Sequence, residues 1–138
     1  MNVAKKKNIK NNIIFTDLIP WEKIPPYYRI SDIFISASKT ETQGLTYIES
    51  LASGTPALVQ KDEVLDGVVV EGYNGYIFDG VEDLKEKMVY LYNHKEEVLN
   101  IRNNCYESIT KFSKEHFSKK ILSIYEKAIE SYKGKREE

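Results

Sequence analysis

Two glutamates, a glycine and several small polar side chains stand together between residues 38 and 49. This segment follows an apolar run at 33–36 and leads into a run with helical periodicity, so it is predicted to be a loop between a strand and a helix. Gly44 allows backbone to approach a ligand closely, and the first amides of the following helix favour an anion. The helix dipole adds about 0.3 to 2 kcal/mol, so the loop suits a diphosphate.

The glutamates lie on the two sides of these amides. Glu49 is five residues beyond Gly44, which places its Cα roughly 7.5 Å further along a helix, where a ribose attached to the diphosphate would lie. Glu41 precedes the helix and would accept hydroxyls from whatever the diphosphate carries. Glu49 also borders the predicted core face, so we expect a ligand diol or a neighbouring donor beside its carboxylate. That core face consists of Leu45, Ile48, Leu51 and Ala52.

Two other interpretations stay open from the residues alone. A capping loop with a glutamate in the first helical turns is a common feature of helices that bind nothing. Two carboxylates also suit the acid and base of a hydrolase, but those groups must be about 5 to 9.5 Å apart across a bond. Sequence spacing does not show such a separation.

The composition describes one globular domain with few reactive groups. The 138 residues are 41% hydrophobic, and 20 basic side chains nearly balance 21 acidic ones, so we expect no nucleic acid partner. No apolar run reaches the roughly 20 residues of a membrane span, so we expect a cytoplasmic protein. Cys105 stands alone and is predicted to be a small buried hydrophobe. We expect His94 and His116 to be structural or exposed, and we expect neither a metal site nor a cofactor.

The pattern of apolar runs predicts an α/β fold, a parallel-sheet Rossmann-like sandwich with C-terminal helices. A helix at 45–53 between two strands implies parallel pairing through a crossover. The strands around it are apolar throughout, which suits a sheet covered on both faces. A broken helix is expected at 21–30, where prolines interrupt the run. The predicted strands are 12–15, 33–36, 57–59 and 76–78.

After residue 79 the periodicity is helical only. Ser113 is a plausible cap for the last helix, predicted to run to about Tyr132. Four strands are few for a nucleotide-binding α/β domain, which commonly has six, so residues 1–138 are interpreted as one partial domain, the second part of a larger one. Two apolar faces are predicted, one of Val81, Leu84, Met88 and Leu91, the other of Phe117, Ile121, Ile124, Ala128 and Tyr132.

These residues resemble a known family. Glu41 and Glu49 with seven residues between them, followed by Gly54-Thr55-Pro56, resemble the E-x7-E signature of the retaining GT-B-fold glycosyltransferases of group 1, also called family 4. The segments 14–16, 28–34 and 72–78 fall where that family has its strand, helix and G-x-x-G-hydrophobic elements. Within the family, segments 41–49 and 68–75 are most similar to bacterial enzymes that glucosylate diacylglycerol from UDP-glucose.

The resemblance implies a division of roles within the loop. Glu41 would contact donor-sugar hydroxyls as the catalytic-site glutamate, and Glu49 would bind the ribose. Backbone amides between them would hold sugar and diphosphate. The implied donor-binding residues are Glu41, Thr42, Gln43, Gly44, Leu45, Thr46 and Glu49.

Two departures from the family pattern concern the loops. Gln43 stands where the family usually has an aromatic residue, and Asp17 where it usually has a glycine after the first strand. The basic pair that neutralises the leaving diphosphate in the family, and its N-terminal acceptor-binding domain, have no counterpart in these residues. We therefore expect this chain to be inactive by itself.

The leading hypothesis is the donor-binding part of a transferase that moves a hexose, glucose from UDP-glucose, with retention to a lipid or saccharide hydroxyl. The alternative is a non-catalytic nucleotide-sugar-binding or interaction module of the same fold. An incomplete sheet would leave one edge strand open to pairing with a second copy. The lysines between 111 and 127 suggest peripheral contact with the inner face of a membrane, although interspersed glutamates favour a solvated surface.

Overall fold

The computed structural model describes residue 4 and the ranges 6–40, 44–62 and 67–134. Its sheet has three parallel strands in the order β1-β2-β3: β1 (Phe34–Ser36), β2 (Ala57–Gln60) and β3 (Gly75–Phe78). Helix α3 (Leu45–Ala52) connects β1 to β2, so the predicted parallel pairing through a crossover is confirmed.

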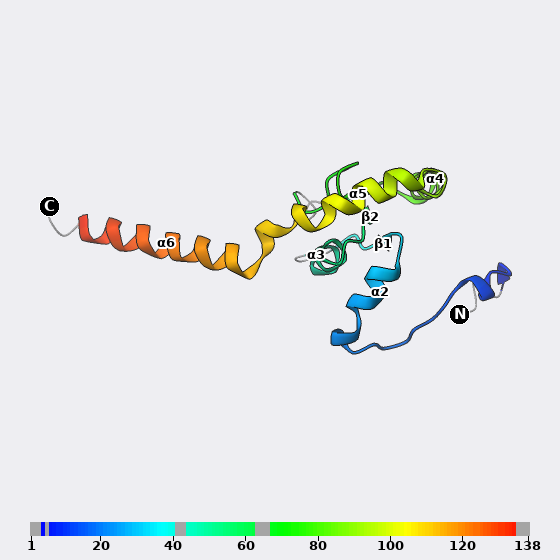
Figure 1. The fold of residues 1–138 in the computed structure, drawn as a ribbon, viewed down its shortest axis with the longest axis horizontal. Coiled ribbons are helices and arrows are strands. Elements are labelled where there is room, and N and C mark those ends of the chain that lie inside the picture. The colour runs from blue at the N-terminus through cyan, green and yellow to red at the C-terminus, as the bar shows by residue number, and fades with distance from the viewer. Residues whose placement is uncertain (1–3, 5, 41–43, 63–66, 135–138) are drawn as a thin grey trace.

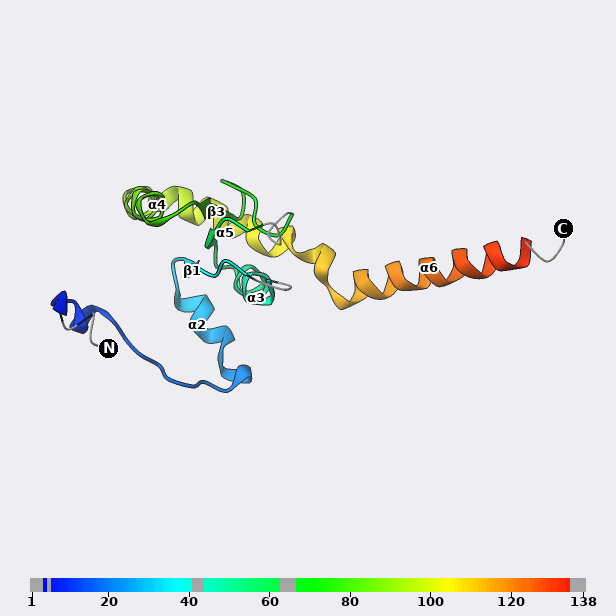
Figure 2. The ribbon, with the colours of Figure 1, turned by 180° about the vertical axis from the view of Figure 1, so that it is seen from behind.

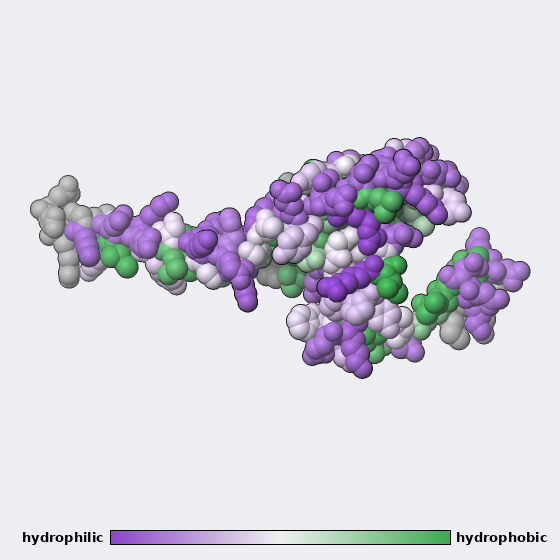
Figure 3. Space-filling view, viewed as in Figure 1, coloured by the Kyte–Doolittle hydropathy of each residue, from purple (hydrophilic) through white to green (hydrophobic). Residues whose placement is uncertain are grey.

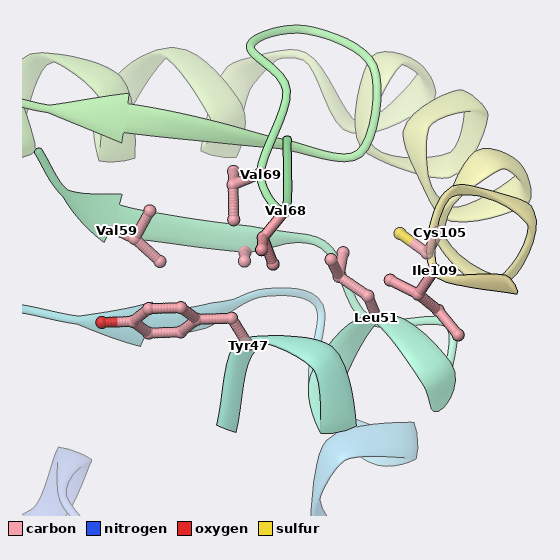
Figure 4. Packing of buried hydrophobic residues seen from close by; sticks show 8 residues of the cluster. Tyr47, Leu51, Val59, Val68, Val69, Cys105 and Ile109 are labelled. Atoms are coloured by element: carbon pink, nitrogen blue, oxygen red, sulfur yellow. The ribbon is translucent and has the colours of Figure 1, made fainter. Parts of the chain in front are cut away.

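The central strand β2 is buried on both faces of the sheet because its side chains alternate between two apolar clusters. Val59 belongs to the apolar cluster that also contains Tyr47 and Leu51 of α3 and Cys105, drawn in Figure 4. Leu58 points to the other face, where it packs with Phe78 and Leu91. All four residues of β2 are buried, which confirms the prediction for this strand. The same prediction is wrong for β1, where Ile35 is 39% exposed because β1 is an edge strand of the described sheet. The predicted fold class, a parallel α/β sandwich, is confirmed.

Short helices precede the sheet and long helices follow it (Figure 1). The expected broken helix at 21–30 is confirmed as a 3-10 turn, η2 (Trp21–Lys23), followed by α2 (Pro25–Ile30). Ser113 caps the last helix, since its Oγ accepts the amide of His116 at 3.2 Å. The remaining elements are η1 (Lys10–Asn12), α4 (Val81–Asn93), α5 (Lys95–Ser108), η4 (Thr110–Phe112) and α6 (Lys114–Gly134).

The predicted strand at 12–15 is wrong. Ile13 has extended backbone, with φ −124° and ψ 126°, but the segment pairs with none of the described strands and lies apart from the sheet in both views (Figures 1 and 2). Ile14 is 89% exposed. A strand requires a hydrogen-bonded neighbour, and an extended apolar segment without one does not become part of a sheet.

The helical periods of the C-terminal half are correct, but their burial is not uniform. Leu84 and Leu91 of α4 pack against the sheet, whereas Val81 is 77% exposed. Helix α6 projects from the body of the molecule, and apolar side chains such as Phe117 and Ile124 lie on its surface (Figures 1 and 3). The periodicity of the sequence thus predicts the apolar face of α6 but does not predict whether that face is buried.

Candidate functional site

The candidate site lies where β1 ends and α3 begins. The hydroxyl of Tyr47 and the Oγ of Ser36 are 3.4 Å apart, and the amide of Ser38 donates to the same Oγ at 3.3 Å. The last residue of β1 is therefore held against the first turns of α3. This is the carboxyl end of a parallel strand, where ligands bind in open α/β sheets.

Gly44 starts α3 in a conformation that only glycine adopts easily. Its φ is 61° and ψ 31°, in the left-handed region, and its position is buried. A Cβ added there would lie 2.9 Å from Cδ2 of Tyr47. The glycine thus lets the backbone rest on the tyrosine ring, which fixes the start of the helix.

The first amides of α3 are free of intrahelical bonds. Helical bonding begins at Tyr47 and Ile48, whose amides donate to the carbonyl of Gly44 at 3.0 and 3.3 Å. Helical geometry leaves the amides of Leu45 and Thr46 without an intrahelical acceptor, and both residues are exposed. Such a helix start is suited to an anion, as the sequence predicted.

The core face of α3 differs from the predicted one. Leu45 is 56% exposed and Ala52 is also exposed. The buried residues are Tyr47, Ser50 and Leu51. Ser50 can be buried because its hydroxyl donates to backbone carbonyls of Tyr47 at 3.1 Å and Thr55 at 3.3 Å. The buried face is therefore rotated toward Tyr47 and Ser50, which are not among the predicted core residues.

Glu49 lies at the edge of this face and is half-buried. The Nε1–H of Trp21 donates to its Oε1 at 3.4 Å, and the hydroxyl of Tyr28 donates to its Oε2 at 3.3 Å. This confirms the expectation of a neighbouring donor beside the carboxylate. Burial, together with the charge of Glu49, raises the pKa of Tyr28 to about 12, so its hydroxyl keeps its proton at neutral pH.

The structure places part of the predicted site. Gly44, Leu45, Thr46 and Glu49 lie together at the start of one helix. Glu41, Thr42 and Gln43 lie outside the described residues. Trp21 and Tyr28 were not predicted as site residues, although an aromatic and proline-rich crossover directly before β1 is a signal for donors near α3.

The other reactive side chains have structural surroundings. Cys105 is fully buried, and burial raises the pKa of its thiol to about 11, so it stays protonated near neutral pH. His94 is exposed and stacks on Tyr90, and His116 is exposed at the start of α6. Within the described ranges, no three His, Cys, Asp or Glu side chains gather as a metal ligand set. None of the described helices is both long and apolar enough for a transmembrane span.

Comparison with known proteins gives the same family as the motifs. The family description "Glycosyl transferases group 1" matches residues 2–112. An alpha-monoglucosyldiacylglycerol synthase of Acholeplasma laidlawii is 37% identical over 72% of this chain, and one of Streptococcus pneumoniae is 35% identical over 91%. The chain covers 25% and 28% of those two proteins, about a quarter of their length.

Solved structures agree with the observed fold. The C-terminal domain of a group 1 family glycosyltransferase from Francisella tularensis superposes with a TM-score of 0.71 at 26% identity, over 80% of this chain and 58% of that domain. Sucrose-phosphate synthase from Thermosynechococcus elongatus shares the fold, with a TM-score of 0.83 at 19% identity over 94% of this chain and 33% of that one. The family match extends over most of the chain and includes the β1–α3 loop, so the chain belongs to the group 1 glycosyltransferases.

Proposed function

We propose that the chain is the donor-binding part of a retaining hexosyltransferase that uses UDP-glucose and a lipid or saccharide hydroxyl. The observation that carries the proposal is the start of α3, where free amides follow a glycine held on Tyr47 and Glu49 lies further along the same helix. A helix start of this kind favours a diphosphate, and a carboxylate beyond it offers acceptors to the hydroxyls of a ribose. The lipid-glucosylating relatives support glucose as the sugar and a lipid as the acceptor.

The loop residues take complementary roles in this proposal. Glu41 accepts hydroxyls of the donor sugar, and the backbone from Thr42 and Gln43 to Thr46 holds the sugar and diphosphate. The reaction then proceeds by electrostatic stabilisation of the departing diphosphate and the oxocarbenium-like sugar. Retention of the anomeric configuration is part of the proposal. It is supported by the spacing of Glu41 and Glu49, which resembles the E-x7-E signature of retaining enzymes.

The cations for the leaving diphosphate are proposed to come from outside these residues. Arg102 is already used, since its guanidinium donates to the carbonyls of Ser31 at 2.8 Å and Arg29 at 3.4 Å. An acceptor-binding domain is likewise proposed as the partner. The chain alone should therefore form no glycolipid from labelled UDP-glucose and diacylglycerol above a control without protein.

Titration of UDP into the chain tests the proposal. Glu49→Gln should weaken UDP binding about 10- to 100-fold, because hydrogen bonds to a charged group contribute roughly 1.5 to 3 kcal/mol. Glu86→Gln on α4 is the control, because Glu86 is an exposed glutamate on another helix. An unchanged dissociation constant for Glu49→Gln, with the fold intact, removes Glu49 from the site. Glu41→Ala should lower UDP-glucose affinity more than UDP affinity, and an equal loss would contradict its role at the sugar.

The alternative, a non-catalytic nucleotide-sugar or interaction module, makes a different prediction. Joined to an acceptor-binding domain that carries basic residues, the proposed enzyme transfers glucose, whereas the module does not. Turnover by such a complete protein would exclude the alternative.

We also propose a cytoplasmic protein that touches the inner face of the membrane. The exposed apolar side of α6, edged by lysines such as Lys120 and Lys127, supports this contact. Co-sedimentation with anionic vesicles would test it.

Self-association through the sheet edge is a separate proposal. Strand β1 is an edge strand of the described sheet, and Ile35 on it is 39% exposed. A groove of about 630 Å³ lies beside it, lined mainly by apolar residues such as Leu58 and Leu99 and also by charged ones such as Arg102. Sedimentation should show dimers that Ile35→Lys dissociates, whereas a monomeric wild type would refute the idea.

A further inference from the structure

Both carboxylate oxygens of Glu49 have a donor from the segment before β1. Trp21 reaches Oε1 from η2 and Tyr28 reaches Oε2 from α2. The two donors belong to the same segment, η2 and α2, so the orientation of the carboxylate is set by that segment together with α3. A hollow of about 160 Å³, lined by Ile24 and Pro25 among others, opens beside the carboxylate.

Tyr28 is itself held firmly. Its carbonyl accepts the Oγ1–H of Thr55 at 2.6 Å, and Thr55 is fully buried directly before β2. Its ring meets Phe34 edge-on, with ring centroids 5.5 Å apart and an interplanar angle of 73°. The hydroxyl of Tyr28 therefore approaches Glu49 from a fixed point.

An aromatic row connects the two ends of the candidate site. Tyr28 contacts Phe34 of β1, and Phe34 in turn contacts Tyr47 with ring centroids 6.1 Å apart. Tyr47 is the ring on which Gly44 rests. The start of α3 and the carboxylate of Glu49 are thus braced by the same row of side chains.

We infer that Tyr28, assisted by Trp21, is a positioning residue that orients the Glu49 carboxylate toward the two ribose hydroxyls of the donor nucleotide. The inference rests on the proposed function of Glu49. A carboxylate offers about four lone-pair sites, and the two donors occupy one on each oxygen. The remaining site on each oxygen matches a vicinal diol, which presents two donors side by side.

The proton on Tyr28 is available for this role over a wide range of pH. Burial and the neighbouring Glu49 raise the pKa of the hydroxyl to about 12. The hydroxyl therefore stays a donor to the carboxylate at every pH at which the protein is expected to work. Substitution by phenylalanine removes this donor and keeps the ring contact with Phe34.

The test compares UDP with 2′,3′-dideoxy-UDP in NMR-detected titrations of the complete 138-residue chain. The wild type should bind UDP at least about 10-fold more tightly than the dideoxy analogue, because only UDP offers the diol. Tyr28→Phe should weaken UDP binding roughly 3- to 10-fold and leave the analogue unchanged, so the ratio between the ligands falls. Trp21→Phe should lower the ratio less, because Trp21 is 70% exposed.

Tyr27→Phe is the matched control, since Tyr27 is the neighbouring tyrosine of α2 and is 44% exposed. It should leave both affinities unchanged. If Tyr28→Phe weakens the binding of both ligands equally, the tyrosine has only a structural role. If it weakens the binding of neither, the tyrosine does not orient Glu49. Either result overturns the inference. A wild type that binds the two ligands equally, or binds neither, would instead overturn the proposed role of Glu49 together with the inference.

Discussion

Helices α3 and α6 have equally clear apolar periodicity and opposite surroundings. Leu51 of α3 is fully buried between the sheet and α5, whereas Ile124, on the predicted apolar face of α6, is 53% exposed on a helix that projects from the body (Figure 1). The positions of both helices could be predicted from sequence because periodicity is local. Burial depends on residues far away in the chain, and only α3 has strands directly before and after it to provide them.

The largest expected effect is the contrast between Leu51→Ala and Ile124→Ala. The buried substitution should lower the free energy of unfolding by about 2 to 5 kcal/mol, through lost burial and the cavity left behind. The alanine substitution on α6 should stay within about 0.5 kcal/mol. Urea denaturation of both variants measures the difference. Similar losses would mean that α6 is packed in solution and would break the comparison.

A second pair of variants separates the two constraints on Gly44. Gly44 and Gly54, at the two ends of α3, have φ values of 61° and 75°. An alanine Cβ at Gly44 meets the ring of Tyr47 at 2.9 Å, whereas one at Gly54 meets nothing within 4 Å. Both alanines should cost about 1 to 2 kcal/mol in backbone strain.

The clash adds to this cost at Gly44 alone. Forcing an extra carbon into a packed region costs about 1 to 3 kcal/mol, so Gly44→Ala should be less stable than Gly54→Ala by that amount. Thermal or urea unfolding of the two variants gives the difference. In addition, Gly44→Ala should weaken UDP binding and Gly54→Ala should not. Equal stabilities would show that the Tyr47 ring moves aside.

The positions of the candidate residues were predictable where they depend on local structure. Gly44 and Glu49 follow from a loop, a helix start and the spacing along one helix, and both lie at the predicted place. The donors to Glu49 were not predictable, since Trp21 and Tyr28 are separated from it by 28 and 21 residues and meet it only through the packing of α2 on α3.

Secondary structure, like the candidate site, was predictable where it depends on neighbouring residues and not where it depends on residues far away in the chain. β2 was predicted correctly because a strand buried on both faces has an unbroken apolar run. The segment at 12–15 has a similar apolar pattern, but pairing requires a neighbouring strand, and that is a property of the whole sheet. Asp17 shows that a departure can keep the geometry, because it adopts a left-handed φ of 51° where the family usually has glycine.

The smallest expected effect concerns the far side of the molecule, where α4, α5 and β3 meet. The hydroxyls of Tyr76 and Tyr90 both donate to the carboxylate of Glu97, the latter at 2.6 Å. These hydrogen bonds, Tyr76 first, lower the pKa of Glu97 below its ordinary value of 4.5. A carboxyl whose pKa is lower in the folded state stabilises the fold above the unfolded pKa, and this contribution disappears as pH falls through the folded pKa.

Glu97→Gln should therefore reduce stability at pH 7 and make the decline of stability below about pH 4.5 less steep than in the wild type. Glu96→Gln is the control, because Glu96 and Glu97 both lie in the first turn of α5, near the positive end of its dipole. Only the Glu97 variant loses the tyrosine donors, which are the largest causes of the lowered pKa, with a smaller contribution from the charge of His94. Urea denaturation between pH 3 and 7 measures both profiles. Parallel profiles would show that the tyrosines do not favour the ionised carboxylate, and that the contact between α4 and α5 is held by apolar packing alone.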